Sequence, residues 1–462
     1  MREYRKVHFI GIGGIGMSGL ARLLLKLGFE VTGSDLRPSE ITKMLEKEGA
    51  LIYYGHKPRQ VEGADLVVYS TAIPQGNPEL VRAKELGLKI IPRAQMLVEI
   101  MELHRFNIVV AGAHGKTTTS SMLATVLTRG GLSPTVAVGG RVNGFDGNAW
   151  LGEERAYLVA EADESDGSFL RMSPDLAIIT NIDAEHLDYY QDLSQIKKAF
   201  LDFAKKVKQK LVICADDKEL LALCKSLDSK DIITYGLASQ ADYVGHIVSE
   251  GAQSLFVVYE KEKLLGEILL PVPGRHNILN ALGVVAAARA LGLSFEAIRK
   301  GFSSFSGVKR RFELKGQAGG IKVFDDYAHH PTEIRATLNA FRKAFPDNRL
   351  VVLFQPHRYT RTKALFGDFV SSFDEVDVLL LTEIYPASEE PIPGVTGEAL
   401  FNALARRRCK ETYFAPELSL LLARALDVIK PGDVLITMGA GDIYRTGEAI
   451  LEEIGVREKE VA

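Results

Sequence analysis

The feature that most constrains the fold of this chain is a repeated alternation of apolar runs, glycine-rich or polar turns, and segments with helical spacing. VHFIGIG, FNIVVAGAHG and RLVVLFQ are apolar runs that end in such turns. Continuous apolar strands that alternate with helices are typical of parallel sheets covered on both faces. We therefore predict an α/β fold.

The alternation falls into three blocks, which is the number that about 150 residues per domain suggests for a chain of 462. The first block ends in a helix-like stretch near His104, the second opens with FNIVVAGAHGKTTT, and the third begins near Val308. We therefore expect three α/β domains, at residues 1–104, 105–307 and 308–462.

Composition excludes several classes of function. The 56 basic and 59 acidic residues nearly balance, so no overall field would attract nucleic acid or an anionic membrane surface. No apolar run reaches the roughly 18 residues of a membrane-spanning helix. Cys214, Cys224 and Cys409 lack zinc-ligand or CxxC spacing, which favours a reducing compartment. We expect a cytoplasmic protein with no nucleic-acid partner and no membrane insertion.

A glycine-rich turn follows the first apolar strand. Gly11, Gly13 and Gly16 form a GxGxxG motif before a helix-like segment, and Asp35 ends the next strand. This spacing is that of a dinucleotide-binding fingerprint, in which glycines let the backbone approach a diphosphate at a helix N-terminus. A nicotinamide cofactor and a UDP-sugar both fit the motif, and a turn used only for packing is the alternative.

A second glycine-rich loop, GAHGKTT, resembles a P-loop. It is a shortened form, because Val110 stands where the usual motif has its first glycine. Its backbone N–H groups would form a nest for anions, Lys116 would neutralise phosphate charge, and the Thr117 hydroxyl could hold Mg²⁺. The residues expected at the nucleotide phosphates are Gly112, Ala113, His114, Gly115, Lys116, Thr117 and Thr118.

Acidic residues gather at the ends of the next two strands of the second block. EADESD (residues 161–166) has four acids in six positions, and such a group repels itself unless it is solvated or faces a cation. Beside a phosphate loop the natural cation is Mg²⁺, which prefers oxygen ligands. In NIDAEH (residues 181–186), His186 is either structural or a further ligand. A solvated acidic loop is the alternative for EADESD.

Polar residues also mark two helix starts further along the chain. His276, Asn277 and Asn280 begin a long helix-like segment, where asparagine could cap the helix or reach a nucleotide base. DDYAHHP (residues 325–331) carries two acids and two histidines at a strand-to-helix turn, which exceeds what capping requires. We expect Pro331 at the first helical position.

Arginines mark the start of the third block and one of its later turns. Arg311 stands where the second and third blocks meet and could reach back to phosphate or form a surface ion pair. Arg358 and Arg361 are three residues apart, so on one helical turn they would face the same side and form a fork for a carboxylate. A solvated basic turn is the alternative.

Together, these motifs resemble those of the Mur ligases. The segments that carry the resemblance are GIGGIGMSGLA, GAHGKTTT, EADESDGSF, TNIDAEHLDYY, GRHNILNA, DDYAHHPTE and QPHRYTRT, in order along nearly the whole chain. The resemblance implies a Rossmann-like N-terminal domain for a UDP-sugar, a central P-loop ATPase-type domain, and a Rossmann-like C-terminal domain. It implies ATP-dependent ligation of L-alanine to UDP-N-acetylmuramate through an acyl phosphate in peptidoglycan synthesis, with Mg²⁺ or Mn²⁺. We expect a monomer or a weak homodimer.

The resemblance also implies roles for individual residues. The two Mg²⁺ ions would be bound by Thr117 and Glu161 and by His186. The catalytic residues would be Lys116, Glu161, His186, His329, Arg358 and Arg361. Further contacts to ATP would come from His276, Asn277, Asn280, Arg311 and Asp326. The sugar nucleotide and alanine would be held by Gly13, Gly16, Asp35, Ser70, Thr71, His329, Arg358 and Arg361.

Three other functions remain as alternatives. A ligase that recycles a murein tripeptide shares several motifs, although EADESDGSF and QPHRYTRT here are of the alanine-adding type. A nicotinamide-dependent oxidoreductase would leave the P-loop and the third block without a role. A P-loop ATPase that acts as a mechanical or binding module would leave Arg358 and Arg361 unused.

Overall fold

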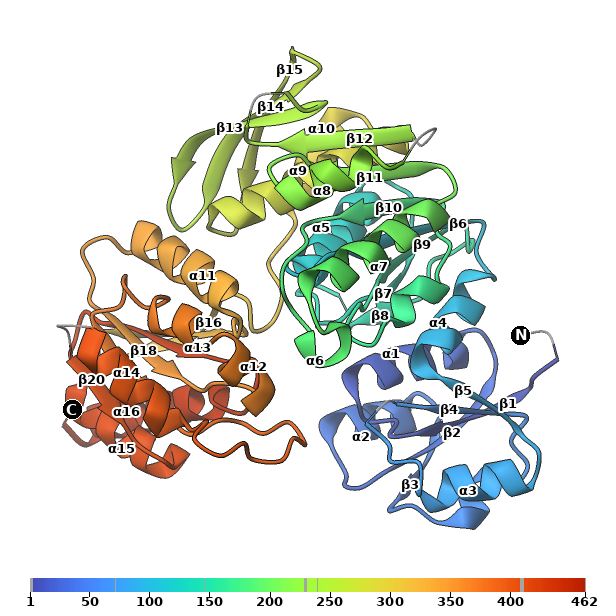
Figure 1. Cartoon of the computed structure of the whole chain (residues 1–462), viewed down its shortest axis with the longest axis horizontal. Helices are drawn as coiled ribbons and strands as arrows, with labels where there is room; N and C mark the ends of the chain where they lie inside the picture. Colours follow the sequence, from blue (N-terminus) through green and yellow to red (C-terminus); the bar gives the residue numbers. More distant parts are fainter. Residues whose placement is uncertain are drawn as a thin grey trace.

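The structure is a computed structural model that describes residues 3–70, 72–145, 147–227, 231–238, 240–407 and 411–461. Its strands form three sheets, each in a lobe of its own (Figure 1). The predicted α/β fold with three largely parallel sheets is therefore confirmed. None of the described helices is both long enough and apolar enough to cross a membrane.

The N-terminal lobe is a five-stranded parallel sheet in the order β3-β2-β1-β4-β5. Its strands are β1 (Lys6–Ile10), β2 (Glu30–Asp35), β3 (Leu51–Tyr54), β4 (Leu66–Tyr69) and β5 (Lys89–Pro92). Its helices are α1 (Ile15–Lys26), α2 (Glu40–Lys47), α3 (Pro78–Glu85), α4 (Arg93–Met101) and the 3-10 turn η1 (Pro58–Val61). Because the strand order reverses between β1 and β4, their carboxyl ends open the crevice where such sheets bind ligands. The glycine turn lies at this crevice.

Helix α1 illustrates how the sequence specifies its elements. Its apolar spacing buries Met17, Leu20, Leu23 and Leu24 against the sheet. Gly28 follows the helix with a φ of 89°, a left-handed conformation that favours glycine and ends helices.

The central lobe is a ten-stranded sheet in the order β15-β14-β13-β12-β11-β10-β6-β9-β7-β8. Its strands are β6 (Phe106–Ala111), β7 (Thr135–Ala137), β8 (Ala149–Trp150), β9 (Tyr157–Glu161), β10 (Leu176–Ile179), β11 (Lys210–Cys214), β12 (Asp231–Gly236), β13 (Tyr243–Glu250), β14 (Ser254–Glu260) and β15 (Lys263–Leu270). Its helices are α5 (Lys116–Arg129), α6 (Leu187–Tyr190), α7 (Leu193–Lys206), α8 (Lys218–Cys224), α9 (Arg275–Ala290), α10 (Phe295–Ser303) and the 3-10 turn η2 (Ser168–Arg171). In the run β12-β11-β10-β6-β9-β7 adjacent strands are parallel, whereas the edge strand β8 is antiparallel to β7.

The antiparallel hairpins that join β13, β14 and β15 were not among the predicted elements. These strands bury only alternate residues, such as Phe256 and Val258 in β14. An expectation built on continuous apolar runs passes over strands of this kind, because half-buried strands alternate apolar and polar residues instead.

The C-terminal lobe is a six-stranded sheet in the order β16-β17-β21-β18-β19-β20, with only β16 antiparallel to its neighbour. Its strands are β16 (Glu313–Ala318), β17 (Ile321–Asp326), β18 (Leu350–Phe354), β19 (Val378–Leu381), β20 (Glu411–Phe414) and β21 (Val434–Met438). Its helices are α11 (Pro331–Ala344), α12 (Tyr359–Ala364), α13 (Phe366–Val370), α14 (Gly397–Arg407), α15 (Leu418–Val428) and α16 (Tyr444–Val461). Two separate apolar clusters cover the two faces of the sheet.

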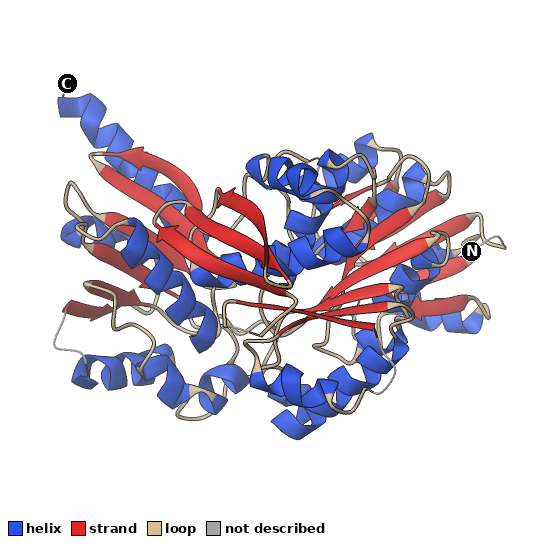
Figure 2. Cartoon of the chain, turned by 90° about the horizontal axis from the view of Figure 1, so that it is seen from above, coloured by secondary structure: helices blue, strands red, loops and turns tan. Residues whose placement is uncertain are grey.

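Figure 2 shows helices flanking the strands on either side. The contacts between the lobes are of two kinds. One continuous apolar cluster runs from the N-terminal lobe into the central lobe, where α1 packs against β8. The C-terminal lobe has apolar clusters of its own and touches the central lobe through α11 and α12.

Candidate active site

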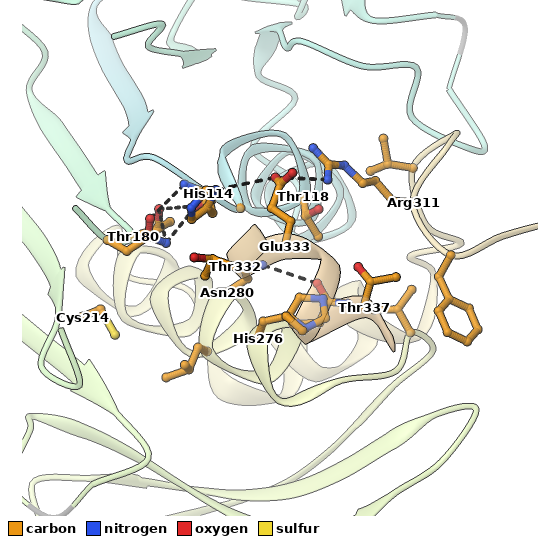
Figure 3. A pocket seen from close by; sticks show the side chains of 18 of the residues that line it. His114, Thr118, Thr180, Cys214, His276, Asn280, Arg311, Thr332, Glu333 and Thr337 are labelled. Carbon is orange, nitrogen blue, oxygen red and sulfur yellow. Dashed lines mark hydrogen bonds and ion pairs between the residues drawn. The ribbon is translucent and has the colours of Figure 1, made fainter. Parts of the chain in front are cut away.

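A cavity of about 340 Å³ lies between the central and C-terminal lobes (Figure 3). His114, His276 and Asn280 line it from the central lobe. Arg311, Asp326 and Glu333 line it from the C-terminal lobe. The parallel strands β10 and β11 end at this cavity, as expected for a ligand site in an α/β sheet.

The predicted phosphate loop connects β6 to α5 at the edge of the cavity. Gly112 and Gly115 have φ values of 135° and 81°, so both need the conformational freedom of glycine. Both also lack room for a side chain. A Cβ at Gly112 would overlap the Thr180 hydroxyl, and one at Gly115 would lie 2.6 Å from Asn280 Oδ1. The loop therefore places backbone at van der Waals distance from the walls of the site.

Lys116, the first residue of α5, points into this loop. Its Nζ donates to the carbonyl oxygens of Gly112 at 2.6 Å and Ala113 at 2.9 Å, and to Glu164 Oε1 at 2.8 Å. Burial would lower the pKa of Lys116, but the nearby charges of Glu164, Glu185 and Glu161 outweigh burial and raise it. A fixed ammonium charge therefore stands where a nucleotide phosphate would enter the loop.

Thr117 and Glu161 meet beside Lys116. The Thr117 hydroxyl donates to both carboxylate oxygens of Glu161, at 2.9 and 3.0 Å, and the Gly139 N–H donates to Glu161 Oε2 at 2.7 Å. Burial raises the pKa of Glu161, against the opposing charge of Lys116. A hydroxyl and a carboxylate at hydrogen-bond distance are the oxygen ligands that Mg²⁺ prefers, so these two residues fit that ion.

A second group of possible ligands consists of Glu164, Glu185 and His186, whose ligand atoms lie within 4.8 Å of one another. His186 Nε2 is 3.5 Å from Glu164 Oε1 and 4.0 Å from Glu185 Oε2. Glu164 Oε2 is buried and has no hydrogen-bond partner among the described residues. A buried acceptor without a partner is costly, and a cation bound here would satisfy it.

Charged side chains from both lobes meet around His114 of the phosphate loop. His114 Nε2 lies 2.8 Å from Asp183 Oδ2, and its Nδ1 lies 3.6 Å from Glu333 Oε1. Burial would lower the pKa of His114, but the hydrogen bond to Asp183 and the charges of Glu185 and Glu333 raise it to about 10. The side chain is therefore an imidazolium between carboxylates of two lobes at neutral pH.

The C-terminal lobe adds further contacts to the same carboxylates. The Thr332 hydroxyl donates to Asp183 Oδ2 at 2.9 Å. Arg361 Nη2 donates to Glu185 Oε1 at 3.3 Å, and His329 Nε2 lies 3.7 Å from the same oxygen. The structure thus brings His329 and Arg361 to the acidic loop ends of the central lobe, as a shared site requires.

Arg358 and Arg361 do not form the fork on one helical face that their spacing predicts. Helix α12 begins at Tyr359, and Arg358 precedes it with a φ of 70°, outside the helical region. Its Nη1 lies 3.8 Å from Glu389 Oε1, whereas Arg361 contacts Glu185. Spacing alone misplaced the helix start, so the two guanidinium groups have different carboxylate partners.

The predicted base-binding residues lie on the far side of the cavity. Asn277 Nδ2 donates to the Pro273 carbonyl at 2.7 Å, and Asn280 Nδ2 lies 3.4 Å from Asn277 Oδ1, so both asparagines also stabilise the start of α9. Burial lowers the pKa of His276 to about 4, which keeps its ring neutral. A neutral imidazole beside two amides suits an uncharged ring better than a phosphate.

Asp326 and Arg311 connect the cavity to the turn that enters the C-terminal lobe. Asp326 accepts from the backbone N–H groups of Phe312 at 2.8 Å and Ala328 at 2.9 Å. Burial raises its pKa to about 6, against the charge of Arg311. Arg311 Nη1 donates to Glu333 Oε1 at 3.4 Å (Figure 3). Pro331 begins α11 as predicted, but His330 caps this helix rather than either aspartate.

Four residues predicted to hold the sugar nucleotide lie in the N-terminal lobe, away from the cavity lining: Gly13, Gly16, Asp35 and Ser70. Asp35 Oδ2 accepts from the Gly13 N–H at 2.8 Å, and Ser70 directly follows β4. A Cβ at Gly16 would lie 3.1 Å from Arg93 Cδ. Thr71 lies outside the described residues.

Several residues at the site were missed. Arg93 pairs with Asp163 at 3.1 Å and so links the N-terminal lobe to the acidic loop. Glu164, Glu185 and Glu333 carry the charges around Lys116 and His114. The three glutamates lie in the motifs EADESD, NIDAEH and DDYAHHPTE, so the motifs indicate their approximate location. A single sequence does not show which acid of such a cluster matters most.

Comparisons with known proteins give matches along nearly the whole chain. Three family models match: the Mur ligase family catalytic domain at residues 6–105, the Mur ligase middle domain at 110–288, and the Mur ligase glutamate ligase domain at 310–441. The UDP-N-acetylmuramate–L-alanine ligase of Geobacter sp. (strain M21) is 50% identical over 452 residues, 97% of each chain. The protein of the same name from Desulfatibacillum aliphaticivorans is 50% identical, over 97% of this chain and 99% of that one.

Solved structures give the same result. The UDP-N-acetylmuramate-alanine ligase of Thermotoga maritima superposes with a TM-score of 0.84 at 32% identity, over 99% of this chain and 100% of that one. A murein peptide ligase from Psychrobacter arcticus superposes with a TM-score of 0.71 at 27% identity, over 98% and 99% of the two chains. On these matches, the chain belongs to the Mur ligase family.

Proposed function

We propose that this chain joins L-alanine to UDP-N-acetylmuramate with cleavage of ATP, giving UDP-N-acetylmuramoyl-L-alanine, ADP and phosphate in peptidoglycan synthesis. The observation that carries the proposal is that a phosphate loop, carboxylates that could hold a metal ion, and an arginine of a second lobe meet at one place. Lys116 of the phosphate loop contacts Glu164, and Thr117 of the same loop contacts Glu161. Arg361 of the C-terminal lobe contacts Glu185, so all three contacts fall on the acidic strand ends of the central lobe. The relatives from Geobacter sp. and Thermotoga maritima named above are alanine ligases, and each matches this chain over nearly its whole length.

The chemistry follows from the poor reactivity of a carboxylate toward amines. Transfer of the γ-phosphoryl group of ATP to the muramate carboxylate gives an acyl phosphate. The neutral amine of alanine attacks its carbonyl carbon, and the resulting tetrahedral intermediate expels phosphate with one former carboxylate oxygen. Lys116 would stabilise the negative charge that develops on the transferred phosphoryl group. A bound Mg²⁺ supplies further positive charge to the phosphates.

We propose the following distribution of roles among the residues. Thr117 and Glu161 hold the first metal ion, and His186 with Glu164 and Glu185 holds the second. His329, Arg358 and Arg361 hold carboxylates of muramate and alanine. The remaining ATP contacts come from His276, Asn277, Asn280, Arg311 and Asp326. The uridine diphosphate portion lies at the glycine turn with Gly13, Gly16, Asp35, Ser70 and Thr71.

The proposal also includes the domain limits, the metal ion, the location and the oligomeric state. We propose domain limits at residues 1–104, 105–307 and 308–462, a division supported by the three separate sheets. We propose that Mn²⁺ can substitute for Mg²⁺, since the same oxygen ligands suit both ions. We also propose a cytoplasmic location and a monomer or weak homodimer.

The test is phosphate release with each substrate omitted in turn. We expect release to require ATP, UDP-N-acetylmuramate and L-alanine together. Replacing alanine by a preformed L-alanyl-γ-D-glutamyl tripeptide separates this function from tripeptide recycling, and we expect little release with the tripeptide. Phosphate release from ATP alone, at the rate of the complete mixture, would contradict the proposal.

A further inference from the structure

A network of buried polar side chains lies inside the N-terminal lobe, away from the cavity between the other two lobes. Its centre is Glu79 at the start of α3, whose side chain is fully buried. Glu79 Oε2 accepts from His8 Nε2 at 2.6 Å, and Oε1 accepts from His56 Nδ1 at 2.6 Å and from Ser34 Oγ at 2.7 Å. The hydrogen bonds from His8, Ser34 and His56 outweigh burial and lower the pKa of Glu79, so the carboxylate is ionised.

Burial of this carboxylate carries a free-energy cost that an apolar side chain in the same place would not have. Burying a charge costs free energy that partners offset only in part, and an apolar side chain of similar volume often gives equal or greater stability. Four separate elements, β1, β2, the segment after β3, and α3, each supply one member of the network. An arrangement of this kind specifies the positions of its members more than it stabilises the fold.

One arm of the network leads to the glycine turn. The Ser34 hydroxyl donates to Glu79, and the Ser34 carbonyl accepts from the backbone N–H groups of Gly11 at 2.9 Å and Ile12 at 3.0 Å. Asp35, the next residue, accepts from the Gly13 N–H at 2.8 Å. The position of Ser34 therefore sets the position of the turn whose backbone must approach a diphosphate.

The other arm ends in His56, which follows β3 at the same edge of the sheet. Gly55, directly before it, donates its N–H to the Asp35 carbonyl at 2.8 Å. The His56 side chain is 14% exposed, whereas His8 and Glu79 are fully buried. Because Nδ1 is engaged with Glu79, the ring can offer only Nε2 to a ligand. Within the described part of the chain, Nε2 of His56 takes part in no hydrogen bond.

We propose that Glu79 is a positioning residue for the nucleoside diphosphate of the sugar nucleotide, acting on the glycine turn through Ser34 and on the ligand through His56 Nε2. This inference rests on the proposed function, which places the uridine diphosphate portion at the glycine turn. Glu79 itself touches no substrate.

The first test is Glu79→Gln, with KM measured for each substrate and the Kd of UDP measured by calorimetry without ATP. Glutamine keeps the shape but turns one acceptor into a donor that faces other donors. We expect the KM for UDP-N-acetylmuramate and the Kd of UDP to rise about tenfold or more, the usual loss for one hydrogen bond to a charged group. The kcat and the KM for ATP should stay near their wild-type values.

A purely structural role gives a different result. It would lower the folded fraction and so lower kcat, while the KM and Kd of the remaining folded enzyme stayed unchanged, and this outcome overturns the proposal. Glu99→Gln is the matched control, because Glu99 is a buried carboxyl of the same lobe paired with Lys89 at 3.2 Å. We expect its KM values to equal those of the wild type.

His56→Asn carries the test if Glu79→Gln fails to fold. We expect the same rise in the KM for the sugar nucleotide, and a double variant no worse than either single one, since both changes remove one function. Additive effects would overturn the link between the two residues. Failure of the wild type to release phosphate with UDP-N-acetylmuramate would contradict the proposed function instead, and failure of the wild type to bind UDP would overturn both.

Discussion

The two junctions between lobes have opposite chemistry. Between the N-terminal and central lobes, α1 packs on β8 over a continuous apolar core, and Asn148 Nδ2 donates to the Ile15 carbonyl at 2.8 Å. Between the central and C-terminal lobes, the contacts are polar, and Thr332 and Arg361 reach Asp183 and Glu185. A cavity of about 270 Å³ lies at the first junction, lined by residues of both lobes such as Ile15 and Asn143, but the packing beside it is apolar. The second junction surrounds the cavity of about 340 Å³ and consists of groups that phosphates and cations would bind.

This difference indicates which lobe moves. Apolar contact buried in a shared core is lost only at a cost in transfer free energy. For a largely buried ion pair such as Arg361 and Glu185, the Coulomb attraction is offset by desolvation, so separation that returns both charges to water costs little. We expect the N-terminal and central lobes to behave as one body, and the C-terminal lobe to close and open over the nucleotide.

The largest effect on turnover is expected from removing the charge of Lys116 in the phosphate loop. Lys116→Ala should lower kcat by about 10²–10³ or more, because a preorganised charge on the phosphoryl group is lost. The Kd of UDP should not change, since the glycine turn lies in another lobe. Steady-state kinetics and calorimetry check both statements. Normal turnover in this variant would refute the role of the loop.

Overpacking the apolar junction should damage stability rather than chemistry. A Cβ at Gly19 of α1 would lie 3.0 Å from Asn148 Nδ2 and 3.2 Å from Ala149 Cβ. Gly19→Val should therefore cost about 1–3 kcal/mol of unfolding free energy, with kcat of the folded enzyme retained. Gly455→Val is the control, since a Cβ there meets nothing within 4 Å. Equal denaturant midpoints for the two variants would show that the junction is loose.

Removing one polar contact at the charged junction should shift closure by a smaller amount. Thr332→Val deletes the hydroxyl that donates to Asp183 at 2.9 Å, and we expect the KM for ATP to rise severalfold, as about 1 kcal/mol implies. Thr128→Val is the control, because the buried Thr128 hydroxyl has no partner among the described residues. An unchanged KM for ATP in Thr332→Val would argue against closure through this contact.

The smallest effect concerns pH and the apolar junction. His104 Nδ1 faces the Ile100 carbonyl at 2.9 Å and Nε2 faces the Thr135 hydroxyl at 2.8 Å, and burial lowers the pKa of His104 below 6.5. The unfolded chain therefore binds a proton near pH 6.5 that the folded chain does not. Stability should fall as pH drops below about 6.5.

His104→Gln isolates this contribution. The variant should be less stable at neutral pH, but its stability should decline less steeply between pH 6.5 and lower pH than that of the wild type. Thermal unfolding across that range is the measurement. Parallel slopes in the two proteins would mean that His104 titrates alike in both states.

Sequence reasoning predicted the elements better than the contacts between them. The buried strand β18 is apolar throughout and β6 is apolar except for Asn107, and Gly28 and Pro331 mark helix limits by backbone chemistry alone. The start of α12 was misplaced because nothing local announces the positive φ of Arg358. Pairings across lobes were out of reach, since Glu185 and Arg361 are far apart in sequence and meet only through the fold.

The site shows the same division. Lys116 and Thr117 were predicted because one continuous motif carries their chemistry. Glu164 was not, because its importance lies in its distance from Lys116 and in its unpartnered oxygen. A role that depends on three-dimensional neighbours needs the structure, whereas a role carried by a local backbone motif does not.

The most direct test of the central claim follows oxygen rather than rate. UDP-N-acetylmuramate labelled with ¹⁸O in its carboxylate is turned over with ATP and L-alanine, and the released phosphate is analysed by mass spectrometry. Activation of that carboxylate at Lys116 predicts one ¹⁸O atom in each phosphate, because the acyl phosphate breaks at its carbon–oxygen bond. Unlabelled phosphate would show that ATP is cleaved by water and would contradict the account.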